Sequence, residues 1–281
     1  MARRVIDAEK EIQHIVDEIK HYFVNNGNAN TKAVIGISGG KDSTIAAALL
    51  VRALGSERVV GVMMPEGTQK DIHDSQEVCD ILNIEAYTIN ISDAVQALYG
   101  GLIPVRAQSD FDGPLPTIVT TNTPARLRMV TLYAVAGIVG GRVINTGNAS
   151  EFYVGYTTKY GDLAGDFAIL RDYYVRDVYD IGDALEELPA HLVHKAPGDG
   201  MSGKTDEDNM GFTYEELDAY LLDFINPDYD TLRNIEERHK RNRHKEDIRI
   251  PYIRESTRHW DDPNHKKVFR HGGVYEEAFS F

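Results

Sequence analysis

The sequence has very little cysteine and no long apolar run. Cys79 is the single cysteine among 281 residues, which excludes an intrachain disulfide and any zinc site built from several cysteines. The longest apolar stretch without a charge, Met129 to Gly141, is too short to span a bilayer as a helix. We therefore expect a cytoplasmic protein that does not enter a membrane.

Positive charge is also scarce. The chain has 30 lysines and arginines against 44 aspartates and glutamates, a formal net charge of -14. Binding to the nucleic-acid backbone depends on basic side chains that meet phosphates, so nucleic acid is not expected as the main partner. Hydrophobic residues make up 42% of the chain, which is enough to bury one large core.

Short apolar segments alternate with helical patterns along the first two thirds of the chain. Apolar runs typical of strands occupy 33–37, 59–64, 86–91 and 143–145, and helical patterns occupy 42–55, 72–82 and 123–136. An amphipathic helix with apolar residues from Ile12 to Phe23 precedes them. This alternation predicts an α/β fold, a mostly parallel twisted sheet with helices on both faces. Ligands of such sheets bind beyond the carboxyl ends of the strands.

The remaining segments complete the predicted organisation. Residues 100–122 have no periodicity and are predicted to form a long loop. Residues 196–211 are rich in glycine and acid, and they are either a mobile lid or a plain surface connection. C-terminal helices are expected at 213–225 and 228–243. We expect a single domain over 1–281, with a sheet core at about 30–190 and a lid and helical region at about 191–281.

A glycine-rich segment, Gly36 to Ser43, joins the first predicted strand to a helix and is called the phosphate loop below. Its glycines let the backbone approach an anion, and the helix N-terminus supplies free N–H groups. The Walker A pattern fails because Ile35 stands where its first glycine belongs, and the pattern Gly-x-Gly-x-x-Gly is absent. A turn that serves packing alone would not need two hydroxyls and a carboxylate beside the glycines.

Within the phosphate loop, the stretch Ser-Gly-Gly-Lys-Asp-Ser at 38–43 resembles the signature of the PP-loop ATP pyrophosphatases. Further stretches resemble ammonia-dependent NAD synthetase. They are Pro-Glu-Gly-Thr-Gln-Lys-Asp at 65–71, Ala-Arg-Leu-Arg-Met at 125–129, Asn-Thr-Gly-Asn-Ala-Ser-Glu at 145–151, Gly-Tyr-Thr-Thr-Lys-Tyr-Gly-Asp at 155–162, and His244-Lys245. Together these stretches extend over most of the chain.

The resemblance implies a fold like that of the adenine-nucleotide alpha hydrolases and an ATP-dependent ligase. Deamido-NAD would be amidated by ammonia to give NAD, AMP and pyrophosphate through an adenylated nicotinate carboxylate, without a covalent protein nucleophile. It also implies a homodimer. With one cysteine and no room for an amidase domain, we expect the chain to use free ammonia or ammonia from another polypeptide.

The same resemblance implies roles for individual residues. The ATP-binding positions are Gly36, Ile37, Ser38, Gly39, Gly40, Lys41, Asp42, Ser43 and Thr146; those for deamido-NAD are Arg126, Lys159, Asp166, His244 and Lys245. Asp42 and Glu151 are the implied ligands of Mg²⁺, which prefers oxygen and commonly binds one or two carboxylates together with substrate phosphates. Arg126 and Lys159 suit phosphates or a carboxylate, and Asp166 suits hydroxyls.

Two positions depart from the family pattern. Val175 stands where many synthetases have a lysine that contacts ATP, so the neighbouring Arg176 is the predicted substitute. Gly198 stands where a small hydroxyl residue is usual, and Lys195 or Lys204 could compensate.

Two other functions fit the sequence less well. A PP-loop enzyme that modifies tRNA would call for a basic surface or several cysteines. A non-catalytic ATP-binding regulatory domain would not need Glu151 together with a second set of cationic residues for a second substrate.

Overall fold

The protein is described by a computed structural model that covers residues 6–69, 72–109, 113–195, 205–222 and 227–246, with two short strands beyond them. The chain forms two compact units, Met1–Glu246 and Asp247–Phe281. In the described part of the second unit, β6 (His265–Lys267) pairs antiparallel with β7 (Glu277–Phe279).

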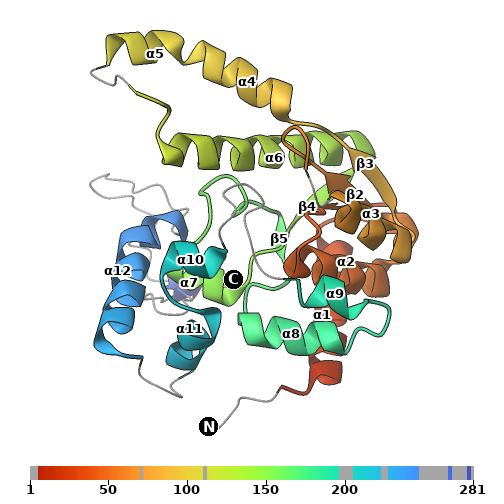
Figure 1. The fold of residues 1–281 in the computed structure, drawn as a ribbon. Helices are drawn as coiled ribbons and strands as arrows, with labels where there is room; N and C mark the ends of the chain where they lie inside the picture. Colours follow the sequence, from red (N-terminus) through yellow and green to blue (C-terminus); the bar gives the residue numbers. More distant parts are fainter. Residues whose placement is uncertain are drawn as a thin grey trace. The chain divides into compact units, whose positions relative to one another are not determined.

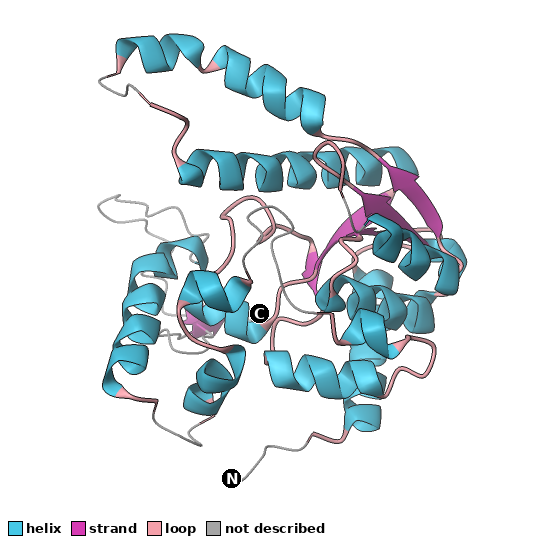
Figure 2. Cartoon of the chain, viewed as in Figure 1, coloured by secondary structure: helices cyan, strands magenta, loops and turns pink. Residues whose placement is uncertain are grey.

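The first unit is built on a five-stranded parallel sheet (Figures 1 and 2). Its strands are β1 (Lys32–Gly36), β2 (Val59–Met63), β3 (Glu85–Thr88), β4 (Gly141–Asn145) and β5 (Phe167–Ala168), in the order β3-β2-β1-β4-β5. All four strand pairs are parallel, and Val34 of β1 is in register with Val60 and Val143. The predicted α/β fold with a mostly parallel sheet is therefore confirmed.

Alternating side chains of the strands enter two cores. Ala33 and Ile35 join the core shared with α1 (Ala8–Asn25), α2 (Lys41–Leu54), α8 (Val175–Asp183) and α9 (Ala190–Val193). Val34 points to the opposite face, where α6 (Thr117–Val139) covers β1 and β4 and contacts α4 (Ser92–Gly101). Helix α3 (Ile72–Ile81) packs against β2 through the first core. This arrangement follows from the two-residue period of a strand, which sends successive side chains to opposite faces.

The first helix shows how the sequence pattern specifies packing. The buried side chains of α1 are Ile12, Ile15, Val16, Ile19 and Phe23, which fall on one face of the helix at positions i, i+3, i+4, i+7 and i+11. Asp7 caps the helix by accepting a hydrogen bond from the Lys10 backbone N–H at 3.2 Å. The helix expected from Ile12 to Phe23 is confirmed.

The predicted loop at 100–122 was wrong. Most of its described residues are helical, because α4 continues to Gly101, α5 spans Ile103–Gln108 and α6 begins at Thr117. Pro104 sits in the first turn of α5, where its missing N–H would have no helical partner in any case. Pro124 lies inside α6 and does not end it.

Part of the chain after β4 forms a helical layer around a third core. Its helices are α7 (Ala149–Val154), α10 (Asp206–Met210), α11 (Tyr214–Leu221) and α12 (Tyr229–Glu246). The last two confirm the C-terminal helices expected at 213–225 and 228–243. Val154, Val175, Met210, Leu217 and Ile235 are buried together there. Helix α12 is tied to α7, since the Asn242 side chain donates to the Val154 carbonyl at 3.0 Å.

The structure describes only part of the predicted lid. Of the predicted lid 196–211, residues 196–204, including Gly198 and Lys204, lie outside the described residues, and α10 occupies most of the rest. Among the helices that the structure describes, none combines the length and the apolar character needed to cross a membrane.

Candidate active site

The phosphate loop lies at the carboxyl end of β1 and leads into α2. Gly39 has φ +74°, and a Cβ there would stand 3.0 Å from the Ser75 backbone nitrogen, so only glycine fits this turn. Ser43 Oγ donates to the Gly40 carbonyl at 3.0 Å and lies 3.0 Å from Ser38 Oγ. In the described part of the chain no side chain caps α2 at Gly40. Its first N–H groups are therefore available to an anion.

Asn148 brings the two predicted metal ligands together. Its side-chain amide donates to Asp42 Oδ1 at 3.1 Å across 106 residues of sequence. Asn148 also caps α7: its backbone N–H donates to Glu151 Oε2, and its Oδ1 accepts from the Glu151 backbone N–H, each at 3.1 Å. Asp42 follows β1 and Glu151 follows β4, the two strands between which the connections of the sheet reverse direction. Ligands of parallel sheets bind at such a switch point.

The charges at this point favour a cation. Lys41 Nζ pairs with Asp42 Oδ2 at 2.7 Å, and the lysine side chain is only 3% exposed. Burial opposes its charge, but the carboxylates of Asp42 and Glu151 more than offset this and raise the pKa of Lys41. Burial, followed by repulsion from Asp42, raises the pKa of Glu151 to about 8. A divalent cation would relieve this repulsion between the carboxylates.

The donor set fits Mg²⁺ bound together with a substrate. The described residues contain no group of three or more histidines, cysteines, aspartates or glutamates able to enclose an ion. Two carboxylates beside the phosphate loop match the coordination preference of Mg²⁺, which takes its remaining ligands from water and phosphate oxygens.

Four of the five residues predicted for deamido-NAD meet at the loop 155–162. Arg126 Nε of α6 donates to the Lys159 carbonyl at 3.2 Å, and Lys159 Nζ donates to the His244 carbonyl at 2.5 Å. Lys245 Nζ donates to the carbonyls of Gly155 and Thr157, both at 2.8 Å. The structure therefore places cationic groups from α6, this loop and α12 side by side.

Asp166, Thr146 and Arg176 are the other residues predicted to bind substrate. Asp166 accepts hydrogen bonds from the Val143 backbone N–H at 2.8 Å and from the Tyr133 hydroxyl at 3.2 Å. It lines a groove of about 880 Å³ between α6 and the turn that joins α1 to β1. Thr146 directly follows β4. Arg176 lies in the first turn of α8, and its Nε is buried with no hydrogen-bond partner among the described residues.

Sequence reasoning missed two residues that support the site. Asn148 lies in the stretch 145–151 that resembles the family. The spacing Asn-x-x-Glu from Asn148 to Glu151 is typical of a helix start, and this signal could have identified Asn148 as a supporting residue. Asp218 of α11 gave no local signal. Its Oδ1 accepts from Ser150 Oγ at 2.5 Å, and its Oδ2 accepts from the Arg176 backbone N–H at 3.0 Å. Asp218 therefore joins α11 to α7 and to the start of α8.

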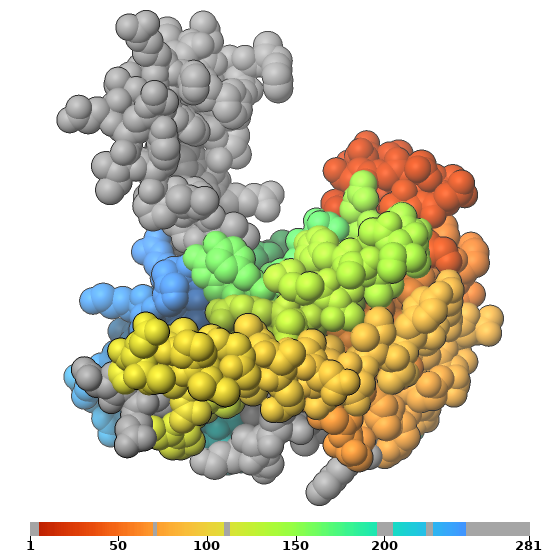
Figure 3. All heavy atoms as spheres, turned by 90° about the horizontal axis from the view of Figure 1, so that it is seen from above, coloured from red at the N-terminus to blue at the C-terminus, as the bar shows by residue number. Residues whose placement is uncertain are grey.

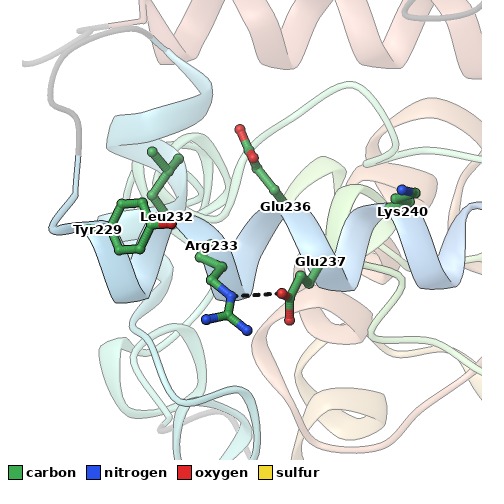
Figure 4. A pocket seen from close by; sticks show the side chains of 6 residues that line it. All are labelled: Tyr229, Leu232, Arg233, Glu236, Glu237 and Lys240. Atoms are coloured by element: carbon green, nitrogen blue, oxygen red, sulfur yellow. Dashed lines mark hydrogen bonds and ion pairs between the residues drawn. The ribbon is translucent and has the colours of Figure 1, made fainter.

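A separate hollow of about 280 Å³ runs along α12 (Figure 4). It is lined by Tyr229, Leu232, Arg233, Glu236, Glu237 and Lys240, and Arg233 pairs there with Glu237 at 2.8 Å. None of the predicted site residues lines this hollow, so we do not assign it to the active site.

A phosphate-binding turn at the switch point of a parallel sheet, followed by an acid and faced by a second acid, defines a nucleotide-binding α/β protein of the PP-loop type. The profile of the NAD synthase family matches residues 11–256. The chain belongs to this family.

Individual relatives agree with this assignment. The NH(3)-dependent NAD(+) synthetase of Pyrococcus furiosus is 37% identical over 219 residues, which are 78% of this chain and 79% of that protein. The structure of NMN synthetase from Francisella tularensis is similar with a TM-score of 0.79 at 33% identity, over 89% of this chain and 100% of that one. The structure of an NH3-dependent NAD synthetase from Campylobacter jejuni in complex with nitrate is similar with a TM-score of 0.68 at 28% identity, over 89% of this chain and 100% of that one.

Proposed function

We propose that this protein is an ammonia-dependent NAD synthetase, which amidates deamido-NAD at the expense of ATP. The observation that carries this function is the cluster of Asp42, Asn148 and Glu151 at the phosphate loop of a chain in the NAD synthase family. Family membership favours it over a tRNA-modifying enzyme and over a regulatory ATP-binding domain.

The reaction replaces a poor leaving group with a good one. An oxygen of the nicotinate carboxylate attacks the α-phosphorus of ATP, the bond from that phosphorus to the bridging oxygen breaks, and pyrophosphate leaves. Ammonia then attacks the carboxyl carbon, AMP leaves with the oxygen that bound it, and a proton is lost from nitrogen. The protein contributes positioning and charge neutralisation rather than a covalent intermediate of its own.

The ATP side of the site is proposed to lie at the start of α2. Backbone N–H groups of the phosphate loop, from Gly36 to Ser43, would bind phosphate oxygens, with Lys41 as the adjacent cation. Asp42 and Glu151 would hold Mg²⁺, which when bound neutralises charge on the triphosphate. We assign Thr146 and Arg176 to ATP as well, because Thr146 follows the switch-point strand β4 and Arg176 Nε is buried without a hydrogen-bond partner in the described part of the chain.

The deamido-NAD side is proposed to lie between α6, the loop 155–162 and α12. The side chains gathered there include the cationic Arg126, Lys159 and Lys245, with His244 beside them, and they suit a dinucleotide with two phosphates and a carboxylate. Asp166, in its groove, would bind a hydroxyl group.

We further propose a homodimer formed through α4, α5 and α6. These helices make up much of the face seen from above in Figure 3 and carry exposed apolar side chains. The exposed ones are Leu98, Ile103, Val105, Ile118, Val130, Tyr133 and Ile138, the last 84% exposed. Exposed apolar side chains that gather on neighbouring helices favour an interaction site. The groove that contains Asp166 adjoins it, since Tyr133 belongs to both.

A second candidate product is NMN. The Francisella tularensis NMN synthetase structure is more similar to this chain than the Campylobacter jejuni synthetase structure, by TM-score and by identity. Amidation of the deamidated mononucleotide would need the same adenylation chemistry. For the compartment we propose a reducing cytoplasm, which suits the single buried Cys79.

The test is to incubate the purified chain with ATP, Mg²⁺ and ammonium, and with either deamido-NAD or its mononucleotide. We expect NAD, AMP and pyrophosphate in equal amounts, with the higher kcat/KM on the dinucleotide. Preference for the mononucleotide would assign the chain to NMN synthesis. Pyrophosphate release without amidation of either compound would refute both.

A further inference from the structure

Tyr214 of α11 faces the proposed ATP site from the C-terminal helical layer. Thr213 caps α11, and the Tyr214 backbone N–H is held by Glu207 Oε1 at 2.9 Å. The side chain is 4% exposed and packs with Val175 and Leu217 in the third core. Its ring lies 5.8 Å from Lys41 Nζ, measured to the ring centroid. The phenol therefore adjoins the first residue of α2, where the triphosphate is proposed to bind.

The hydroxyl of this tyrosine is unusual. It is buried, and it has no hydrogen-bond partner among the residues that the structure describes. An unpaired buried hydroxyl destabilises the folded state, because its hydrogen bond to water is lost and not replaced. A phenylalanine would fill the same apolar space without this penalty, so packing does not account for the hydroxyl.

The surroundings decide what kind of group the hydroxyl can bind. Burial, then the carboxylates of Glu151, Asp206 and Asp42, raise the pKa of Tyr214 well above its ordinary value. The phenol therefore keeps its proton and acts as a donor. The neighbouring donors, Lys41 and the free N–H groups at the start of α2, all suit an anion.

We propose that the Tyr214 hydroxyl is a binding residue for ATP, which donates a hydrogen bond to a triphosphate oxygen beside Lys41. This inference rests on the proposed function, because it takes ATP to be the anion at the phosphate loop. The hydrogen bond forms only when the nucleotide is present, which accounts for a hydroxyl without a partner among the described residues. Helix α11 thereby contributes a direct contact to the proposed ATP site.

The experiment compares Tyr214→Phe with the unchanged protein and with Tyr220→Phe. Tyr220 lies on the same helix, and its hydroxyl bonds to Glu236 at 3.3 Å. The probe is α,β-methylene-ATP with Mg²⁺, which cannot be cleaved between the α and β phosphates; its Kd is measured by calorimetry. We expect about tenfold weaker binding in Tyr214→Phe, the loss typical of a hydrogen bond to a charged acceptor, and no change in Tyr220→Phe. The thermal midpoint of free Tyr214→Phe should equal or exceed that of the unchanged protein.

Binding and turnover separate the possible failures. Equal Kd values for the nucleotide in Tyr214→Phe and the unchanged protein would overturn the proposal and assign the tyrosine to packing. A fall in the midpoint of the free variant would also overturn it, since the hydroxyl would then have a partner already. Weaker nucleotide binding in a protein that makes no NAD would uphold the role of Tyr214 and refute only the proposed reaction.

Discussion

Asp218 is the buried acid that joins α11 to the site, and its replacement by asparagine makes a quantitative prediction. The side chain is 1% exposed and accepts hydrogen bonds from Ser150 and from the Arg176 backbone N–H. Burial is the largest influence on this carboxyl and raises its pKa from 3.8 to about 6, against the opposing hydrogen bond from Ser150. The asparagine keeps the shape of the side chain and removes the titration.

The sign of the pH effect follows from linkage. Because the folded-state pKa is above the unfolded value, the folded protein holds this proton more tightly. Its contribution to stability is complete below the unfolded pKa and is lost as pH rises to the folded pKa. A difference of roughly two units corresponds to about 3 kcal/mol between pH 3.8 and about 6. The excess stability of the unchanged protein over Asp218→Asn should therefore shrink by up to about this amount as pH rises through that window.

Urea unfolding of both proteins at several pH values between 3 and 7.5 measures this difference. Asp228→Asn is the matched control, because Asp228 is exposed and hydrogen bonds from the Thr231 backbone lower its pKa. Its difference from the unchanged protein should change in the opposite direction, with stability lost as pH falls. Parallel curves for the unchanged protein and Asp218→Asn would refute the reasoning.

Three further predictions concern the metal, a close contact and the interface. Asp42→Asn and Glu151→Gln should keep the fold and lose most activity, with partial recovery in excess Mg²⁺; near-normal turnover of both at limiting Mg²⁺ would contradict the metal assignment. Gly155→Ala should lower the free energy of unfolding by about 1–3 kcal/mol, because φ is +62° and the new Cβ would overlap Asn242 Cβ; an unchanged urea midpoint would show that α12 can move away without cost. Ile138→Glu should give monomers by analytical ultracentrifugation at micromolar concentration, and a fully active monomer of the unchanged chain would exclude the proposed dimer.

The elements that local pattern specifies were predicted well. Alternating apolar runs and glycine-rich turns indicated four of the five strands of the first unit, since a buried parallel strand needs only apolar neighbours in sequence. The two-residue strand β5 was too short to leave a pattern. The segment 100–122 does not read as helical from sequence because glycine and proline are typical of loops, although proline in the first turn of a helix is tolerated. Helices α4 and α5 show exposed apolar side chains instead of a clean amphipathic pattern.

The phosphate loop can be recognised from local sequence, because its turn, its glycines and its helix start lie within eight consecutive residues and need no distant partner. Local sequence also shows which residues resemble those of the family. Three contacts depend on the folded chain instead: Asn148 bridges Asp42 and Glu151, Asp218 joins α11 to α7 and α8, and the Tyr214 ring lies near Lys41. These contacts join segments that are distant in sequence, and they exist only because parallel strands bring their carboxyl ends to one edge while a later helical layer packs over it.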